Sequence, residues 1–147
     1  MSGEMVVIDA SVAVKAVLPN PLQSNCLTLV ESFVDDIPVA PALWTYETTS
    51  AIAKAVYFKD LTLEEGQRAI EQLDALSVHL FAADVDHNRA AFQWTQKLNR
   101  ASIYDSYYLV LAQALGCDFW TADRRLFNAL QEMRLDWVHW VGALGPE

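Results

Sequence analysis

The feature that most constrains the fold is a short apolar run that ends in a carboxylate, MVVID at residues 5–9. The run is too short for a helix, and continuous apolar runs of this length are typical of strands buried on both faces in a parallel sheet. A helical pattern follows at once. Because α/β proteins bind ligands in a crevice outside the carboxyl ends of their strands, we expect Asp9 to lie at such a crevice.

The rest of the chain alternates short apolar runs with helical patterns. We predict further strands at residues 37–41, 79–82, 117–123 and 137–141, and helices at residues 22–33, 43–59, 62–77, 84–99, 104–115 and 124–133. This alternation predicts parallel strands joined by right-handed crossovers, with helices covering both faces of the sheet. The length of 147 residues suits a single domain, residues 1–147.

Several polar residues stand where helices are expected to begin. Thr62 and Glu65 form a capping-box pattern, and Ser102 and Asp105 have the same spacing. Ser11 is expected to cap the helix that follows the first strand. These signals are structural and by themselves predict no chemistry.

Composition narrows the classes of function and partner. The hydrophobic content of 53% is high for a small domain, and it predicts a homo-oligomer or a bound partner that covers apolar side chains. The net charge of −9 argues against a broad basic surface that binds nucleic acid, so any nucleic-acid chemistry would need cations. Two distant cysteines and the lack of a membrane-length apolar run predict a soluble, cytoplasmic protein that spans no membrane.

Four acidic residues stand where one predicted element changes into the next: Asp9, Glu47, Asp105 and Asp123. Each has a structural explanation on its own: carboxylates are favoured at the N-cap and in the first turn of a helix, and Glu47 alone would be an ordinary solvated helix residue. Strand ends and the helix starts that they lead into share one edge of a parallel sheet. We therefore expect Asp9, Asp105 and Asp123 to be neighbours.

Bringing carboxylates together is unfavourable without compensation. Two of them about 4 Å apart repel by roughly 4 kcal/mol at an effective dielectric constant of 20, which corresponds to a pKa shift of about three units. A protein that gathers them either holds protons at neutral pH or binds a hard divalent cation. We expect Mg²⁺ or Mn²⁺, because such sites keep several waters and close on phosphate.

Three segments, VVIDASVAVKAVL, YETTSAIAKAV and YDSYYLVLAQALGCDFWTADRRLF, resemble in order and spacing the PIN-domain ribonucleases, in particular the VapC toxins of prokaryotic toxin-antitoxin pairs. The resemblance covers nearly the whole chain. It implies a three-layer α/β/α sandwich with a central, mainly parallel sheet. It also implies hydrolysis of RNA phosphodiester bonds, a homodimer, and a small VapB-like antitoxin as partner.

The same resemblance implies the residues of the site. Asp9, Glu47, Asp105 and Asp123 would be the catalytic, metal-binding acids around Mg²⁺ or Mn²⁺.

Five other residues match positions beside these acids. Ser11 and Thr121 would contact phosphate or a metal-bound water, although a helix cap and a strand residue explain them equally well. Lys15, Arg124 and Arg125 would contact the RNA backbone, and solvated helix residues are the alternative interpretation.

Two other functions are compatible with an acidic site on an α/β fold. A receiver-like or phosphatase-like domain also clusters acids around Mg²⁺, but a receiver needs paired acids after its first strand, where Asp9 is preceded by Ile8. The second is a PIN-like module that binds a partner without catalysis. The presence of all four acids favours an enzyme over that module.

Overall fold

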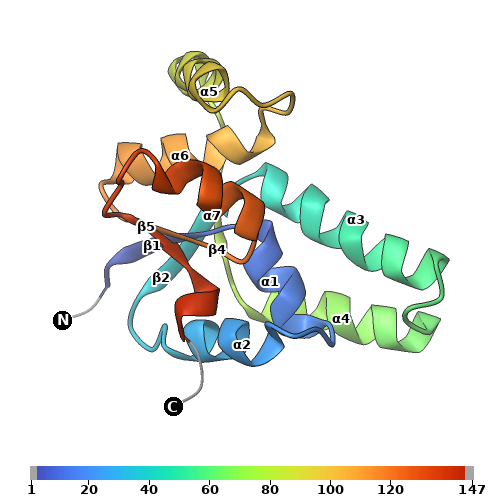
Figure 1. Cartoon of the computed structure of the whole chain (residues 1–147). Helices are drawn as coiled ribbons and strands as arrows, with labels where there is room; N and C mark the ends of the chain where they lie inside the picture. The colour runs from blue at the N-terminus through green and yellow to red at the C-terminus, as the bar shows by residue number, and fades with distance from the viewer. Residues whose placement is uncertain (1–2, 145–147) are drawn as a thin grey trace.

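A five-stranded sheet lies at the centre of the computed structural model, which describes residues 3–144 (Figure 1). All neighbouring strands are parallel, in the order β3-β2-β1-β4-β5. The strands are β1 (Met5–Ile8), β2 (Ile37–Pro41), β3 (His79–Phe81), β4 (Asp118–Thr121) and β5 (Val138–Trp140). The predicted parallel sheet and the α/β/α class are confirmed.

Helices alternate with these strands, as predicted. They are α1 (Ala10–Val17), α2 (Gln23–Glu31), α3 (Leu43–Tyr57), α4 (Leu63–Ala75), α5 (Val85–Leu98), α6 (Tyr104–Leu115) and α7 (Arg124–Gln131), with a final 3₁₀ turn, η1 (Val141–Leu144). Helix α6 packs on β1, β2 and β4, and α5 packs on α6. Within residues 3–144, no helix combines the length and the apolar character needed to cross a membrane.

Strand β1 is buried on both faces, which explains its unbroken apolar sequence. Val7 belongs to one core cluster with Phe119 of β4 and Tyr108 of α6. Ile8 belongs to a second cluster with Val12 of α1. Successive side chains of the strand thus point into two different cores.

The strand order places a topological switch point between β1 and β4. From β1 the sheet extends through β2 to β3 on one side, and through β4 to β5 on the other. Such a reversal opens a crevice at the carboxyl ends of the two central strands. Asp9 directly follows β1, and its backbone N–H donates to the carbonyl of Trp120 in β4 at 3.0 Å. Asp123 follows β4 by two residues, so both acids lie at this crevice.

Two predictions about helix starts have opposite outcomes. The capping box of α4 is confirmed: Thr62 Oγ1 accepts from the Glu65 N–H at 3.1 Å, and Glu65 Oε1 accepts from the Thr62 N–H at 2.8 Å. The prediction that Ser11 caps the first helix is wrong. Asp9 is the N-cap of α1, with an extended backbone (φ −65°, ψ 150°) and a side chain that accepts from the Ser11 N–H.

The Ser102–Asp105 capping box is also absent. The N-cap of α6 is Ile103, whose side chain makes no capping bond, and Ser102 Oγ accepts only a long 3.4 Å bond from the Tyr104 N–H. The carboxylate of Asp105 pairs with Arg100 instead. The side chain of Asp105 is therefore oriented by an ion pair and not by the capping box that its spacing from Ser102 suggested.

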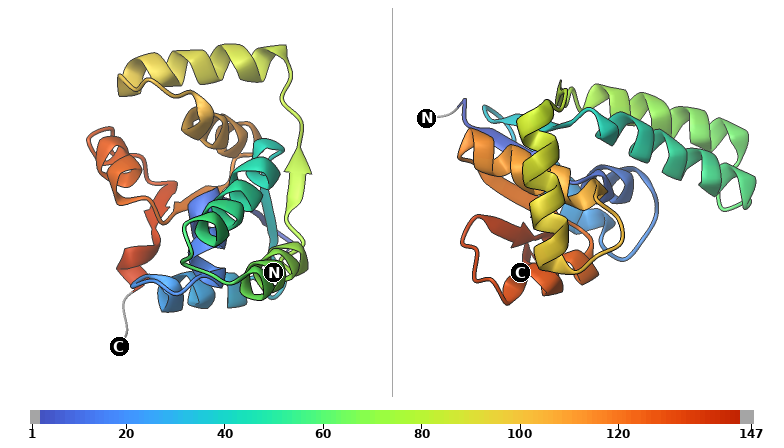
Figure 2. Two further views of the ribbon diagram at one scale, coloured as in Figure 1. Left: turned by 90° about the vertical axis from the view of Figure 1, so that its right-hand side faces the viewer. Right: turned by 90° about the horizontal axis from the view of Figure 1, so that it is seen from above.

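Helices α3 and α4 form a pair that projects away from the sheet, which Figure 2 shows most clearly from above. Their close approach depends on Gly66, where a Cβ would lie 2.5 Å from Cγ2 of Val56. Helix α3 also packs on α1. That contact brings Glu47, in the second turn of α3, toward the crevice.

Candidate active site

Asp9 is the most buried of the four predicted site acids, with 5% of its surface exposed. Its Oδ2 accepts from the hydroxyl of Thr121 at 2.7 Å and from that of Ser11 at 3.1 Å. Among residues 3–144, its Oδ1 accepts only a 3.5 Å bond, from the Ser11 N–H. One oxygen of this carboxylate is thus firmly held, while the other is nearly free.

The two hydroxyls that hold Asp9 are themselves held by the β4–α7 turn. Ser11 Oγ accepts from the Ala122 N–H, and Thr121 Oγ1 accepts from the Asp123 N–H, both at 3.0 Å. Each hydroxyl therefore donates its hydrogen to Asp9 and accepts from the backbone. This network fixes the Asp9 side chain, and the predicted contacts of Ser11 and Thr121 with phosphate or water stay a prediction.

Glu47 is half-buried and bonded to the core of α6. Its Oε1 accepts from the Tyr108 hydroxyl at 2.7 Å. Burial, together with the charges of Asp9 and Glu47, raises the pKa of Tyr108, so the phenol stays protonated and donates. Burial also raises the pKa of Glu47, and the bond from Tyr108 partly opposes that rise.

Asp105, in the first turn of α6, is paired with a cation. Its Oδ2 lies 3.3 Å from Nη2 of Arg100, which comes from the segment between α5 and α6. Burial raises the pKa of Asp105, and the Arg100 charge opposes that rise. The pair is half-buried, so it is screened less than a surface ion pair.

Asp123 is the N-cap of α7, as its position before that helix predicted. Its Oδ1 accepts from the N–H groups of Arg125 at 3.0 Å and Leu126 at 3.2 Å. Both bonds end on the same oxygen. Capping and a role in the site are compatible, because Oδ2 is not used by the cap.

The four acids form one electrostatic cluster. Burial first, and then the charges of Asp105 and Glu47, raise the pKa of Asp9 to about 7. The charge of Asp105 also raises the pKa of Glu47, and the charge of Asp123 raises that of Asp105. Mutual repulsion of this kind, in a crevice at a switch point, is typical of a functional site.

Sequence comparison identifies the family of this acidic site. The PIN-domain model matches residues 6–132, which include all four acids. The chain belongs to the PIN-domain family. Within it, the chain is 32% identical over 127 residues to the VapC ribonuclease Mb0985 of Mycobacterium bovis and to ribonuclease VapC9 of Mycobacterium tuberculosis. These matches cover 86% of this chain and 92% of each relative, so this PIN domain is VapC-like.

A solved structure supports the fold of this PIN domain independently. The VapBC2 complex of Rickettsia felis, bound to a DNA fragment from its promoter, contains a chain that superimposes with a TM-score of 0.59. The superposition covers 92% of this chain and 96% of that one, at 10% sequence identity. At that identity the likeness bears on the fold alone.

The donor set of the PIN domain fits a hard cation. Within residues 3–144, no three side chains of His, Cys, Asp or Glu lie close enough to hold a metal ion between them. Each of the four carboxylates has its own protein partner. Mg²⁺ keeps several waters and needs only one or two direct carboxylates, so an all-oxygen set with partly free oxygens suits Mg²⁺ or Mn²⁺. The four-acid ligand set itself stays a prediction.

The three predicted RNA contacts of the PIN domain have different surroundings. Lys15 Nζ donates to the Ala122 carbonyl at 2.9 Å and so ties α1 to the β4–α7 turn. The Arg124 guanidinium lies 4.4 Å from the ring centroid of Trp140. Arg125 is exposed. Contact with RNA stays a prediction for all three, and two of them already have a structural partner.

Sequence reasoning missed two residues of the site, Arg100 and Tyr108. Arg100 lies five residues before Asp105, outside any predicted helix, where no periodicity marks it. Tyr108 lies three residues after Asp105 and therefore on the same face of α6, a spacing that can predict proximity. Its bond to Glu47 joins residues 61 positions apart, and only the tertiary fold reveals it.

Proposed function

We propose that this PIN domain is a divalent-metal-dependent endoribonuclease and the toxin of a VapBC-type pair. The observation that carries the proposal is the electrostatic cluster of Asp9, Glu47 and Asp105 at the switch-point crevice. The ribonuclease names of the relatives that match 86% of the chain support it. The family assignment removes the basis for the receiver-like alternative.

The proposed role of the acids is to hold the cation. Each carboxylate uses one oxygen for a protein partner, namely Oδ2 of Asp9 and Asp105, Oε1 of Glu47 and Oδ1 of Asp123. Within residues 3–144, the second oxygen of each accepts no hydrogen bond shorter than 3.5 Å. We expect Mg²⁺ or Mn²⁺ to bind at these second oxygens, with one or two carboxylates as direct ligands and the others acting through bound waters.

The chemistry of RNA hydrolysis then divides between cation and protein. When bound, a divalent cation would lower the pKa of a water and would neutralise charge on the phosphate. The chain itself supplies orientation, because the hydroxyls of Ser11 and Thr121 lock Asp9 and the phenol of Tyr108 locks Glu47. Acids whose side chains are oriented by hydrogen bonds in this way are preorganised for their ligand.

A cleavage assay tests the proposal directly. We expect the wild type to cleave members of a panel of structured RNAs in Mg²⁺ or Mn²⁺ and to lose activity in EDTA. Asp9→Asn and Asp105→Asn should each reduce the rate by about 100-fold or more, because several kcal/mol of charge stabilisation depend on the cation. Asp86→Asn, at an exposed acid in α5, is the matched control and should cleave normally.

Two results would contradict the nuclease. One is a wild type that cleaves no RNA with either metal. The other is Asp9→Asn and Asp105→Asn variants that cleave as fast as the wild type. A folded but inactive wild type that still binds a partner would favour the non-catalytic PIN-like module.

The proposed partners are a second copy of the chain and a small VapB-like antitoxin. Support comes from the 53% hydrophobic content and from exposed apolar side chains at the end of the α3–α4 pair, namely Tyr57, Phe58 and Leu63. Light scattering coupled to size exclusion tests the homodimer. Co-expression with the product of the adjacent gene tests the antitoxin, and a monomer that forms no complex in both experiments would contradict this part of the proposal.

A further inference from the structure

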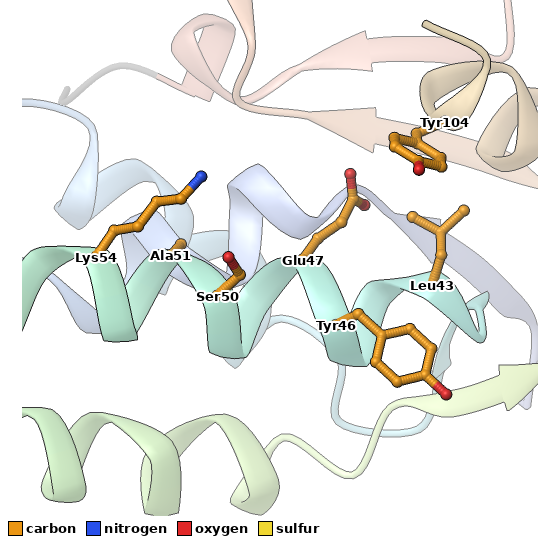
Figure 3. Close-up of a pocket in the computed structure, with 7 residues that line it drawn as sticks. All are labelled: Leu43, Tyr46, Glu47, Ser50, Ala51, Lys54 and Tyr104. Atoms are coloured by element: carbon orange, nitrogen blue, oxygen red, sulfur yellow. The ribbon is translucent and has the colours of Figure 1, made fainter.

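A cleft of about 550 Å³ runs along α3 beside the acidic cluster (Figure 3). Its lining comes from one face of α3 and from the first residue of α6, and consists of Leu43, Tyr46, Glu47, Ser50, Ala51, Lys54 and Tyr104. In Figure 3, Glu47 lies between Tyr104 at one end and Lys54 at the other. A proposed site acid is therefore part of the cleft wall.

Two exposed aromatic rings line this cleft, Tyr46 and Tyr104, and Tyr104 is the one next to a site acid in the sequence. Tyr104 is 57% exposed, although it directly precedes the half-buried Asp105. Its ring faces Leu43 and the side chain of Glu47 across the cleft (Figure 3). The backbone N–H of Tyr104 bonds to Ser102, but its side chain has no hydrogen bond or aromatic partner within residues 3–144.

The negative charge of the chain makes an exposed aromatic ring important for the affinity for RNA. At a net charge of −9, electrostatic attraction contributes little to the affinity for a polyanion. Lys15 and Arg124 are already engaged with protein groups. Stacking of bases on aromatic side chains needs no net positive charge, and it is worth about 1–3 kcal/mol per base.

We infer that this cleft binds one nucleotide of single-stranded RNA next to the acidic cluster, with its base stacked on Tyr104 and its phosphate paired with Lys54. The cleft volume is in the range of about 300–1,000 Å³ that is typical of small-ligand sites. Lys54 lies two helical turns beyond Glu47 on the same face of α3, so its cation sits apart from the acids. The inference rests on the proposed ribonuclease function and names how its substrate is held.

Binding to an uncleaved RNA tests the stacking contact. In the Asp9→Asn background, the affinity for a labelled 12-nucleotide oligo(A) is measured by fluorescence anisotropy. Tyr104→Ala should weaken binding by about 5- to 100-fold, which corresponds to the loss of one stacked base. Tyr104→Phe keeps the ring and should restore most of the affinity. Phe92→Ala, at a 59% exposed aromatic residue of α5 outside the cleft, is the matched control.

The salt dependence of binding tests the phosphate contact separately. Lys54→Gln should reduce the slope of log K against log salt by about 0.7, the change expected when one phosphate contact with a single strand is lost. Lys59→Gln, at an exposed lysine beyond the end of α3, should leave the slope unchanged. Circular dichroism of all variants checks that the fold is intact.

The outcomes separate this inference from the proposed function. If the wild type cleaves RNA while Tyr104→Ala binds and cleaves RNA as the wild type does, the cleft inference fails and the nuclease stands. If Tyr104→Ala changes only the oligomeric state or the binding of an antitoxin, the occupant is a protein and the inference is also wrong. If the wild type cleaves no RNA but binds it through Tyr104, the nuclease fails and the cleft stands.

Discussion

At the starts of α1 and α4, a carboxylate accepts a hydrogen bond from a threonine, but the pKa values of the two carboxylates shift in opposite directions. At α4, Glu65 is fully exposed, and its bonds with Thr62 hold its pKa below the usual value. At α1, Asp9 accepts an equally short bond from Thr121, yet burial and neighbouring acids raise its pKa to about 7. The local bonding pattern alone therefore does not separate a structural acid from a site acid.

Burial and neighbouring charges make the difference between these two regions. Water solvates the Glu65 carboxylate and screens it, so the capping box simply stabilises the helix. The crevice removes most of the water around Asp9 and places Asp105 and Glu47 within electrostatic reach. Charge at Asp9 is thus unfavourable in the free protein, and a cation would relieve that cost.

The largest difference between Asp9 and Glu65 should appear in how much a bound metal stabilises the fold. At 100 times the dissociation constant, Mg²⁺ or Mn²⁺ should raise the free energy of unfolding of the wild type by about 2.7 kcal/mol. Asp9→Asn should lose most of this gain, whereas Glu65→Gln should keep it. Thermal denaturation with and without the metal measures the effect. An equal gain in all three proteins would place the cation somewhere other than the crevice.

Asp9 and Glu65 should also differ in how they change stability with pH, by an amount similar to or smaller than the effect of the metal. Because the pKa of Asp9 is higher in the folded state, its contribution to stability is fully present below about pH 4 and is lost as the pH rises through about 7. From pH 5 to pH 8, in the absence of metal, the free energy of unfolding should fall by roughly 2.6 kcal/mol from this group alone.

The variant Asp9→Asn isolates this contribution, since it removes the titrating group and keeps the size of the side chain. Urea denaturation at several pH values should show a flatter profile for Asp9→Asn than for the wild type and a higher stability at pH 8. Glu65→Gln should keep the wild-type slope in this range, because the Glu65 pKa lies below it. Parallel profiles for the wild type and Asp9→Asn would mean that Asp9 titrates normally.

Much of the fold follows from local patterns in the sequence. The apolar run of β1 and the helical spacing around it predict a strand that helices cover on both faces. In the structure, Val7 and Ile8 are buried in two different core clusters. The capping box at Thr62 also forms as predicted, because both of its bonds join residues three apart. Such signals succeed where the contacts that decide the structure are close in sequence.

The site is less predictable, because contacts between distant residues decide it. The four acids were singled out by their places at element boundaries and by the family resemblance, and the structure links them electrostatically. The bond between Tyr108 and Glu47 and the bond between Thr121 and Asp9 span 61 and 112 residues. The Ser11 cap was predicted wrongly for a related reason: its hydroxyl is used on Asp9, which caps the helix itself.

The smallest contrast concerns the two threonines, Thr62 and Thr121. Thr62→Ala removes an exposed N-cap bond and should lower the free energy of unfolding by about 1 kcal/mol, while Thr62→Ser keeps the hydroxyl and should cost less. RNA cleavage should be unchanged in both, because the start of α4 has no contact with the acids.

Thr121→Val removes a buried hydroxyl that holds Asp9, so it should reduce cleavage as well as metal-induced stabilisation. Urea denaturation and the cleavage assay, applied to the three variants together, separate the two roles. Loss of cleavage in Thr62→Ala, or full activity in Thr121→Val, would show that the two threonines do not differ in their effect on the site. The distinction between a buried site acid and an exposed capping acid would then fail.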